Sequence, residues 1–155
     1  LYTLGVSTFV PKAQTPFLWQ GVRPEADKRL KRLAKRLKPK GIDLRPESYG
    51  WSVIQALLAR SDRRLAAVIA AVRGSQESLG GWKKAYRSGR AGELPAVRSG
   101  GVDLPLPPPW EQVVHDSWCD TTVLPWEHLN GPLGKSTLLR HQRQALAGTV
   151  PTGVD

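Results

Sequence analysis

The sequence predicts one α+β domain that is mostly helical. Three observations indicate this class. Residues 2–10 alternate in the manner of a strand, residues 24–37 have an amphipathic helical pattern, and residues 41–47 form a second strand-like run. Together they make one strand–helix–strand step, whereas most later segments have helical spacing. A length of 155 residues suffices for one domain with appended segments.

The first strand is expected over residues 2–10, because apolar and small side chains alternate there. One side holds Leu4, Val6, Thr8 and Val10, and the other holds Thr3, Gly5, Ser7 and Phe9. Pro11 is expected to end this strand, since proline cannot continue a central ladder. A loop with a second breaker, Pro16, follows.

The clearest helix is expected next, over residues 24–37. Pro24 suits a first helical turn, and Glu25 and Asp27 lie where the helix dipole favours anions. Pro39 and Gly41 are expected to end the helix. Its apolar stripe is narrow and consists of Ala26, Leu30, Leu33, Ala34 and Leu37.

The rest of the chain is predicted to be helical at both ends and irregular between them. Helices are expected over residues 52–60, 62–73, one or two turns within 81–89, 110–118 and 135–148, with Asp62 as an N-cap and Gly74 and Gly148 as stops. Residues 88–109 are rich in Gly and Pro, and their last part is expected to be extended. The division is 1–46 for the strand–helix–strand step, 47–90 for a helical appendage, 91–125 for an irregular segment, 126–148 for a C-terminal helix region and 149–155 for a tail.

The basic charge of the chain is local. The formal net charge is +10, and residues 23–40, with nine Lys/Arg and two acids, supply +7 of it. This distribution argues against a uniformly basic nucleic-acid binder. The longest apolar run, residues 65–72, is too short to span a bilayer. One cysteine gives no disulfide framework, which favours a cytoplasmic location.

Four further patterns each have an ordinary structural interpretation and a more specific functional one. The stretch GPLGKST, residues 131–137, lacks the first glycine of a phosphate-binding loop and is expected to be a helix cap. Asp62, Arg63 and Arg64 form a structural ion-pair network or a clamp for a substrate anion. The three histidines and the single cysteine are expected to be surface, cap or buried residues rather than a metal site: His115, His128, His141 and Cys119. Six tryptophans are expected to anchor irregular segments onto a helical core, with an aromatic substrate pocket as the alternative.

The most specific resemblance lies in residues 6–20, VSTFVPKAQTPFLWQ. This stretch resembles the final barrel strand and following loop of radical S-adenosylmethionine (SAM) enzymes, in the family with an N-terminal cobalamin-binding-like domain. That family reads approximately VSxFVPKPHTPFQW there. Later segments resemble the same family in the same order: LKPKGIDL, ALLARSDRRLAAVI, GGWKKAY and LPWEHLNGPLGKSTLLRHQRQALAG. The chain departs from the family at Ala13, Gln14, Leu18 and Ser61.

The resemblance implies that the chain is the C-terminal part of a longer enzyme. Residues 1–46 would be the last strand–helix–strand step of a partial TIM-type barrel, and the rest a helical appendage. The complete protein would cleave SAM reductively at a [4Fe-4S] cluster, held by a three-cysteine motif upstream. The resemblance leaves open whether cobalamin is a further cofactor. This chain alone would bind no cofactor. Its expected partners are the N-terminal remainder of the polypeptide and an unnamed substrate, without a membrane.

The same resemblance assigns four residues to the SAM side of the barrel. Gly5 and Ser7 would face the lumen and leave room for cofactor, with Phe9 on the same side. Lys12 would lie at the mouth, as the partner of a cofactor carboxylate or substrate anion, or as a rim charge. No residue is assigned a catalytic or metal-binding role.

Two other classes of function stay open at this point. The first is a basic helical module that binds RNA or the ribosome, with a phosphate groove lined by Arg29, Arg32, Arg36 and Lys40. This helix lacks aromatic residues that stack on bases, so a solvated outer face is the expected alternative. The second class is a purely structural appendage that caps a barrel.

Overall fold

The computed structural model describes residues 2–73 and 77–148, and it confirms the α+β class. Two small sheets accompany the helices, and the described residues close no barrel. The elements are β1 (Tyr2–Val6), α1 (Ala26–Leu37), the 3-10 turn η1 (Lys38–Lys40), β2 (Ile42–Pro46), α2 (Tyr49–Arg60), the 3-10 turn η2 (Arg63–Leu65), α3 (Ala66–Arg73), α4 (Leu79–Arg90), β3 (Arg98–Ser99), β4 (Val102–Asp103), α5 (Trp110–Val114) and α6 (Lys135–Leu146).

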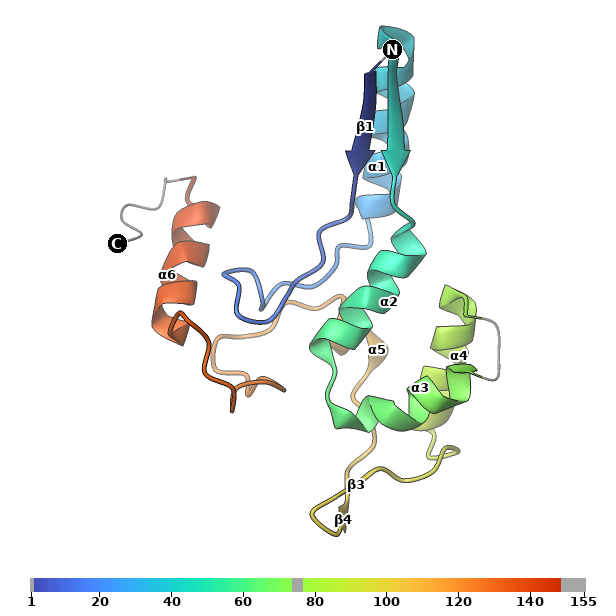
Figure 1. The fold of residues 1–155 in the computed structure, drawn as a ribbon, viewed down its shortest axis with the longest axis vertical. Helices are drawn as coiled ribbons and strands as arrows, with labels where there is room; N and C mark the ends of the chain where they lie inside the picture. The colour runs from blue at the N-terminus through green and yellow to red at the C-terminus, as the bar shows by residue number, and fades with distance from the viewer. Residues whose placement is uncertain (1, 74–76, 149–155) are drawn as a thin grey trace.

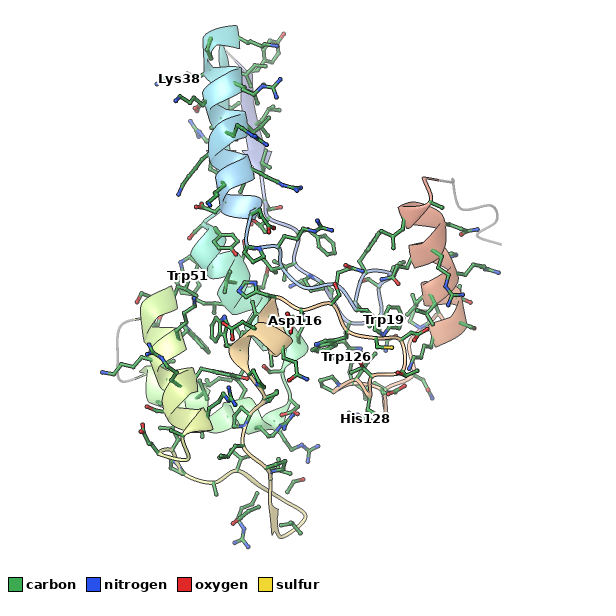
Figure 2. The ribbon with its side chains drawn as sticks, turned by 180° about the vertical axis from the view of Figure 1, so that it is seen from behind. Trp19, Lys38, Trp51, Asp116, Trp126 and His128 are labelled. Carbon is green, nitrogen blue, oxygen red and sulfur yellow. The ribbon has the colours of Figure 1, made fainter. Side chains whose placement is uncertain are left out.

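The first three elements form the expected strand–helix–strand step. β1 and β2 pair in parallel, with Leu4 opposite Leu44, and α1 connects them. Gly41 ends the turn after α1 in the left-handed conformation, at φ 72°, which glycine adopts without strain. The unit of β1, α1 and β2 projects from the helical body (Figure 1), and Lys38 lies at its far tip (Figure 2).

The prediction that the first strand runs to residue 10 is wrong, because β1 ends at Val6. The last bond of the ladder is from the Glu47 N–H to the Val6 carbonyl, at 2.9 Å. Pairing stops there because β2 ends at Pro46 and the chain then turns into α2. Pro11 therefore does not end the strand; it is buried in the turn beyond it.

The apolar side of β1 is only partly covered. α1 packs on β2, where Leu44 is 8 % exposed. Leu4, on the same side of β1, remains 44 % exposed, and Val6 is half-buried. Val10 lies beyond the strand and packs on the helical core instead.

The main core lies between α2, α3, α4 and α5. Its most buried members include Ala56 and Leu57 of α2, Val68 of α3 and Val114 of α5, all 0 % exposed. Burial of a side chain such as Leu57 contributes about 2 kcal/mol. Val22 belongs to the same core, and its N–H donates to the Val114 carbonyl at 2.9 Å, so the loop after β1 is tied to α5.

A second, smaller core joins the loop after β1 to the C-terminal region. It contains Leu18, Trp19, Leu124 and Leu138, with Trp118 and Trp126 packed against it. Figure 2 places Trp19 and Trp126 together beside the base of α6. The prediction that tryptophans anchor irregular segments thus holds for these residues, but Trp51 is 53 % exposed on α2.

Several predicted elements of the C-terminal part differ in extent. α4 has 12 residues rather than one or two turns. Within the segment expected to be irregular, β3 and β4 form a small hairpin around Gly100 and Gly101, which both have positive φ. Gly148 ends α6 as expected, whereas Gly74 and the tail 149–155 lie outside the described residues.

None of the helices in the described part of the chain is both long and apolar enough to cross a membrane.

Candidate functional site

The candidate site lies beyond the carboxyl end of β1, where the chain leaves the sheet. Gly5 is exposed on the uncovered side of β1, and a Cβ added there would meet no heavy atom within 4 Å. Ser7 and Lys12 are also exposed. The open space beside Gly5 is the property that a cofactor-facing position needs.

Phe9 lies in a pocket of about 350 Å³ next to this end of β1. Its ring packs edge-to-face on Phe17, with ring centroids 5.9 Å apart. Gly5, Ser7 and Lys12 do not line this pocket, so Phe9 is the one residue of the four assigned to the SAM side that lines it. The lining is Thr8, Phe9, Phe17, Gln20, Gly21, Arg23, Ala26, Arg29 and Leu146.

Thr8 is not expected in this pocket from the sequence, because the alternation of residues 2–10 places it with Leu4 and Val6. Thr8 is 8 % exposed, and its Oγ1 has no hydrogen-bond partner among the described residues. A buried hydroxyl without a partner is costly and is one mark of a binding site. Thr8 lies two residues beyond the end of β1, so its backbone is not held in the strand ladder.

Two arginines give this pocket a positive rim. Arg23 and Arg29 are exposed, and within the described ranges neither forms an ion pair. The pocket is therefore apolar inside with a cationic edge. Such a lining fits a ligand that has an apolar or aromatic part and an anionic group.

The loop that carries Lys12 is held in place by neighbouring segments. Thr15 Oγ1 donates to the Lys12 carbonyl at 2.8 Å, and Gln14 Nε2 donates to the Leu129 carbonyl at 3.1 Å. Gln14 has φ 59°, which is uncommon outside glycine. Trp19 is 2 % exposed in the second core. These contacts fix the loop at the mouth of the strand, although Lys12 itself points to solvent.

Close approach of two backbones positions the other wall of the site. A Cβ at Gly21 would overlap the His115 carbonyl, so only glycine fits there. His115 Nδ1–H donates to the Val22 carbonyl at 2.8 Å, which gives this histidine a structural role. The two contacts tie the pocket-lining segment around Gly21 to the end of α5.

The basic helix has the exposed charge that the sequence predicted. All basic residues of α1 are exposed, and α1 buries no residue. In the described chain, one ion pair engages this helix, between Lys31 and Asp27 at 2.6 Å. The remaining cations of α1 are Lys28, Arg29, Arg32, Lys35 and Arg36.

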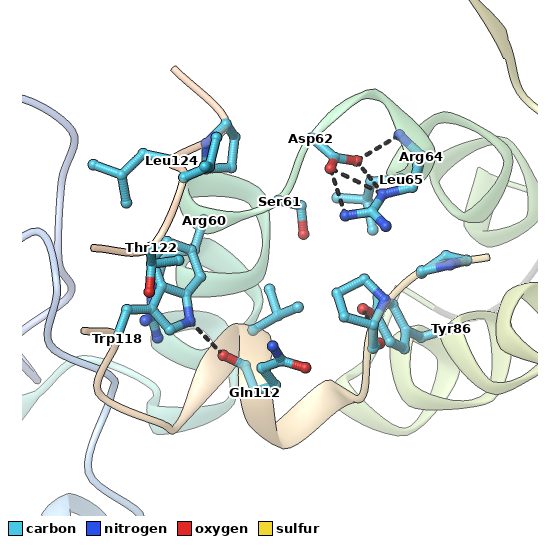
Figure 3. A pocket seen from close by; sticks show the side chains of 15 residues that line it. Arg60, Ser61, Asp62, Arg64, Leu65, Tyr86, Gln112, Trp118, Thr122 and Leu124 are labelled. Atoms are coloured by element: carbon cyan, nitrogen blue, oxygen red, sulfur yellow. Dashed lines mark hydrogen bonds and ion pairs between the residues drawn. The ribbon is translucent and has the colours of Figure 1, made fainter. Parts of the chain in front are cut away.

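The residues Asp62 and Arg64 form the predicted ion pair. Arg64 Nη2 lies 2.7 Å from Asp62 Oδ2, and the Arg64 backbone N–H donates to Asp62 Oδ1 at 2.9 Å, so Asp62 is the N-cap (Figure 3). Hydrogen bonds from Arg64 lower the pKa of Asp62, against the opposing effect of burial. Arg63 points elsewhere and donates to Ser99. With Arg64 neutralised, these residues do not form a clamp for an anion.

The prediction that Cys119 is buried is wrong: it is exposed, beside Asp120 and Thr121. Across the described residues, no three His, Cys, Asp or Glu side chains are grouped to hold a metal ion. The stretch 131–137 forms an ordinary entry into α6, with Gly134 at the N-cap, and Lys135 pairs with Glu127 at 2.9 Å.

Comparison with protein-family models, with curated proteins and with solved structures found no match to this chain.

Proposed function

We propose that this chain is the C-terminal portion of a radical SAM enzyme, which cleaves S-adenosylmethionine reductively at a [4Fe-4S] cluster. The proposal combines the sequence resemblance of residues 6–20 with the arrangement of β1, α1 and β2. The substrate is not specified by either.

The observation that carries the proposal is the incomplete sheet. Among the described residues, β1 and β2 are parallel and pair only with each other, and the side of β1 that bears Gly5 is uncovered. Parallel sheets occur almost only with both faces covered, and two strands are too few to be stable alone. Further strands and a covering layer from another part of the polypeptide would meet both requirements.

The location of the pocket agrees with such a barrel. Active sites of parallel α/β folds lie at the carboxyl ends of the strands. Phe9 and Thr8 lie beyond that end of β1 and line a pocket, while Lys12 is in the loop that follows. In the proposed enzyme, Gly5 and Ser7 leave room for cofactor and Lys12 pairs with an anionic group of cofactor or substrate.

The residues of this chain do not fit an iron–sulfur cluster. Such a cluster needs several cysteine thiolates, and Cys119 is the single cysteine. The cluster ligands therefore belong to an upstream part of the proposed enzyme. In the proposed enzyme, a bound cluster would supply the electron for SAM cleavage, and residues of this chain would supply shape and charge around the cofactor.

The test is anaerobic reconstitution of the full-length protein with iron and sulfide. We expect a cluster absorption spectrum and SAM cleavage that requires a reductant, and an upstream three-cysteine motif in the coding sequence. An intact protein that binds no iron contradicts the proposal. In the reconstituted enzyme, Lys12→Ala should weaken turnover, whereas Lys84→Ala, a matched exposed lysine on α4, should not.

A second candidate is a nucleic-acid-binding module, supported by the exposed and nearly unpaired cations of α1. Binding of an RNA hairpin should weaken with salt, and the triple variant Arg29→Gln, Arg32→Gln, Arg36→Gln should reduce the salt slope by about 3. The matched control removes three exposed arginines elsewhere: Arg73, Arg87 and Arg90. Equal loss in both triple variants would indicate non-specific attraction and contradict the module.

A further inference from the structure

Arg60 is a buried cation with unmet hydrogen-bond donors. It is the last residue of α2 and is 1 % exposed. Its Nη2 donates to the Asp116 carbonyl at 2.9 Å. Its Nε and Nη1 have no partner, and in residues 2–73 and 77–148 it forms no ion pair. An arginine has five N–H donors, so most of its donors are unused.

Burial of Arg60 with unused donors lowers the stability of the fold unless a ligand satisfies them. A buried charge without an ion pair destabilises the fold, and each unused donor adds to that destabilisation. The Trp118 ring, 3.8 Å from the guanidinium carbon, and the carboxyl end of α2 offset part of it. Burial lowers the pKa of Arg60 to about 10, so the side chain stays charged at neutral pH.

Arg60 also lines a pocket of about 470 Å³, separate from the one at the end of β1 (Figure 3). Much of the wall is apolar and includes Leu65, Val113, Leu124 and three prolines. Arg64 lines the pocket too, but its charge is balanced by Asp62. Arg60 is thus the one pocket charge without an ion pair among the described residues, and the charge of Asp116 nearby balances it only in part. The volume suits a small organic molecule.

We propose that this pocket binds a small carboxylic acid with an apolar body, whose carboxylate accepts hydrogen bonds from Arg60. The apolar wall takes the body of the ligand, and a single negative charge balances the guanidinium. This site goes beyond the SAM chemistry proposed above and uses residues of this chain alone.

Trp118 controls access to Arg60. Its ring covers the guanidinium, and its indole Nε1–H donates to the Gln112 carbonyl at 2.7 Å. Trp118 is half-buried and lies in the loop after α5. A carboxylate reaches Nε and Nη1 when this ring moves aside, so binding should change the environment of both side chains.

The test is titration of the ¹⁵N-labelled chain with sodium benzoate, followed by NMR of the Arg60 Nε–H and Trp118 indole N–H signals. We expect both signals to shift and saturate. Benzamide, which has the same shape without the charge, should bind at least tenfold more weakly. Inorganic phosphate, an anion without an apolar body, should also bind more weakly than benzoate.

Two arginine variants complete the test. Arg60→Lys should raise the benzoate dissociation constant at least tenfold, whereas Arg63→Lys, an exposed neighbour outside the pocket, should leave it unchanged. No saturable shift, equal binding of benzamide, or equal effects of the two variants would overturn the proposal. If Arg60→Lys does not fold, the comparison of benzoate with benzamide on the unaltered chain decides. None of these outcomes depends on a cluster or on SAM.

Discussion

The guanidinium of Arg60 lies beneath the indole ring of Trp118, with its central carbon 3.8 Å from the ring centroid. This contact joins the end of α2 to the loop after α5. Trp118 also packs against the second core, so one stacked pair connects the helical body to the segment that holds α6.

Replacement of Trp118 by Ala should therefore destabilise the chain. The variant loses the cation–π contact, about 0.5–2 kcal/mol, together with apolar burial, and it leaves Arg60 uncovered. We expect a fall in the urea midpoint of unfolding. Trp51→Ala is the matched control, because Trp51 is 53 % exposed and should matter little. Equal effects of the two variants would contradict this role for Trp118.

Gly21, which lines the pocket at the end of β1, and Gly5, which does not, should respond differently to substitution. Gly21→Ala places a methyl group against the His115 backbone and should cost at least about 2 kcal/mol. Gly5→Ala meets no atom within 4 Å and should leave the unfolding midpoint of this chain nearly unchanged. In the proposed full-length enzyme, however, Gly5→Ala should weaken SAM binding. Full SAM affinity in that variant would refute the lumenal placement of Gly5.

Because Asp62 pairs with Arg64, the free energy of unfolding should fall when the Asp62 carboxylate is protonated in acid. The folded-state pKa of Asp62 lies below its ordinary value of 3.8, so its contribution to stability is present above pH 3.8 and is lost as pH falls through the folded pKa. For this partly buried pair, we expect about 1 kcal/mol. Urea unfolding at pH 6 and pH 3 should show a smaller pH-dependent loss in Asp62→Asn than in the unaltered chain. Asp43→Asn, in an exposed pair with Arg45, should keep the full loss.

Tyr86 should ionise at a higher pH than an ordinary tyrosine. Burial raises the pKa of Tyr86 to about 12, and its hydroxyl donates to the Pro108 carbonyl at 2.8 Å. Absorbance at the tyrosinate band should show a component near pH 12 that is absent from Tyr86→Phe. Because the unfolded chain ionises near pH 10, stability from this group should fall between pH 10 and 12. Ionisation of all tyrosines near pH 10 in the folded chain would contradict the burial.

The parts of the fold that follow local rules could be predicted from the sequence. The helix between Glu25 and Lys38 and the Asp62 cap depend on near neighbours, and the parallel pairing of the two strands follows from the strand–helix–strand order. The strand end at Val6 could not be predicted, because it depends on where the partner strand ends, 40 residues away along the chain, before the chain turns into α2. Local alternation continues past the point where pairing stops.

The candidate sites depend even more on distant contacts. Arg60 resembles an ordinary basic residue at a helix end until Trp118 and Asp116 cover it. The sequence alternation likewise predicts Thr8 to be a strand residue, but it lies beyond the end of β1 and is buried there. The sequence did predict the exposed cations of α1, since a helix with a narrow apolar stripe must present its other faces to solvent.

The free flanks of β1 and β2 have a practical consequence. Within residues 2–73 and 77–148 each strand has one neighbour, so backbone groups on its outer edge are available to another chain. Purified on its own, this polypeptide should self-associate through these flanks as its concentration rises, and light scattering would detect the growth. A lysine introduced at Thr3 should suppress that growth by charge repulsion between stacked copies.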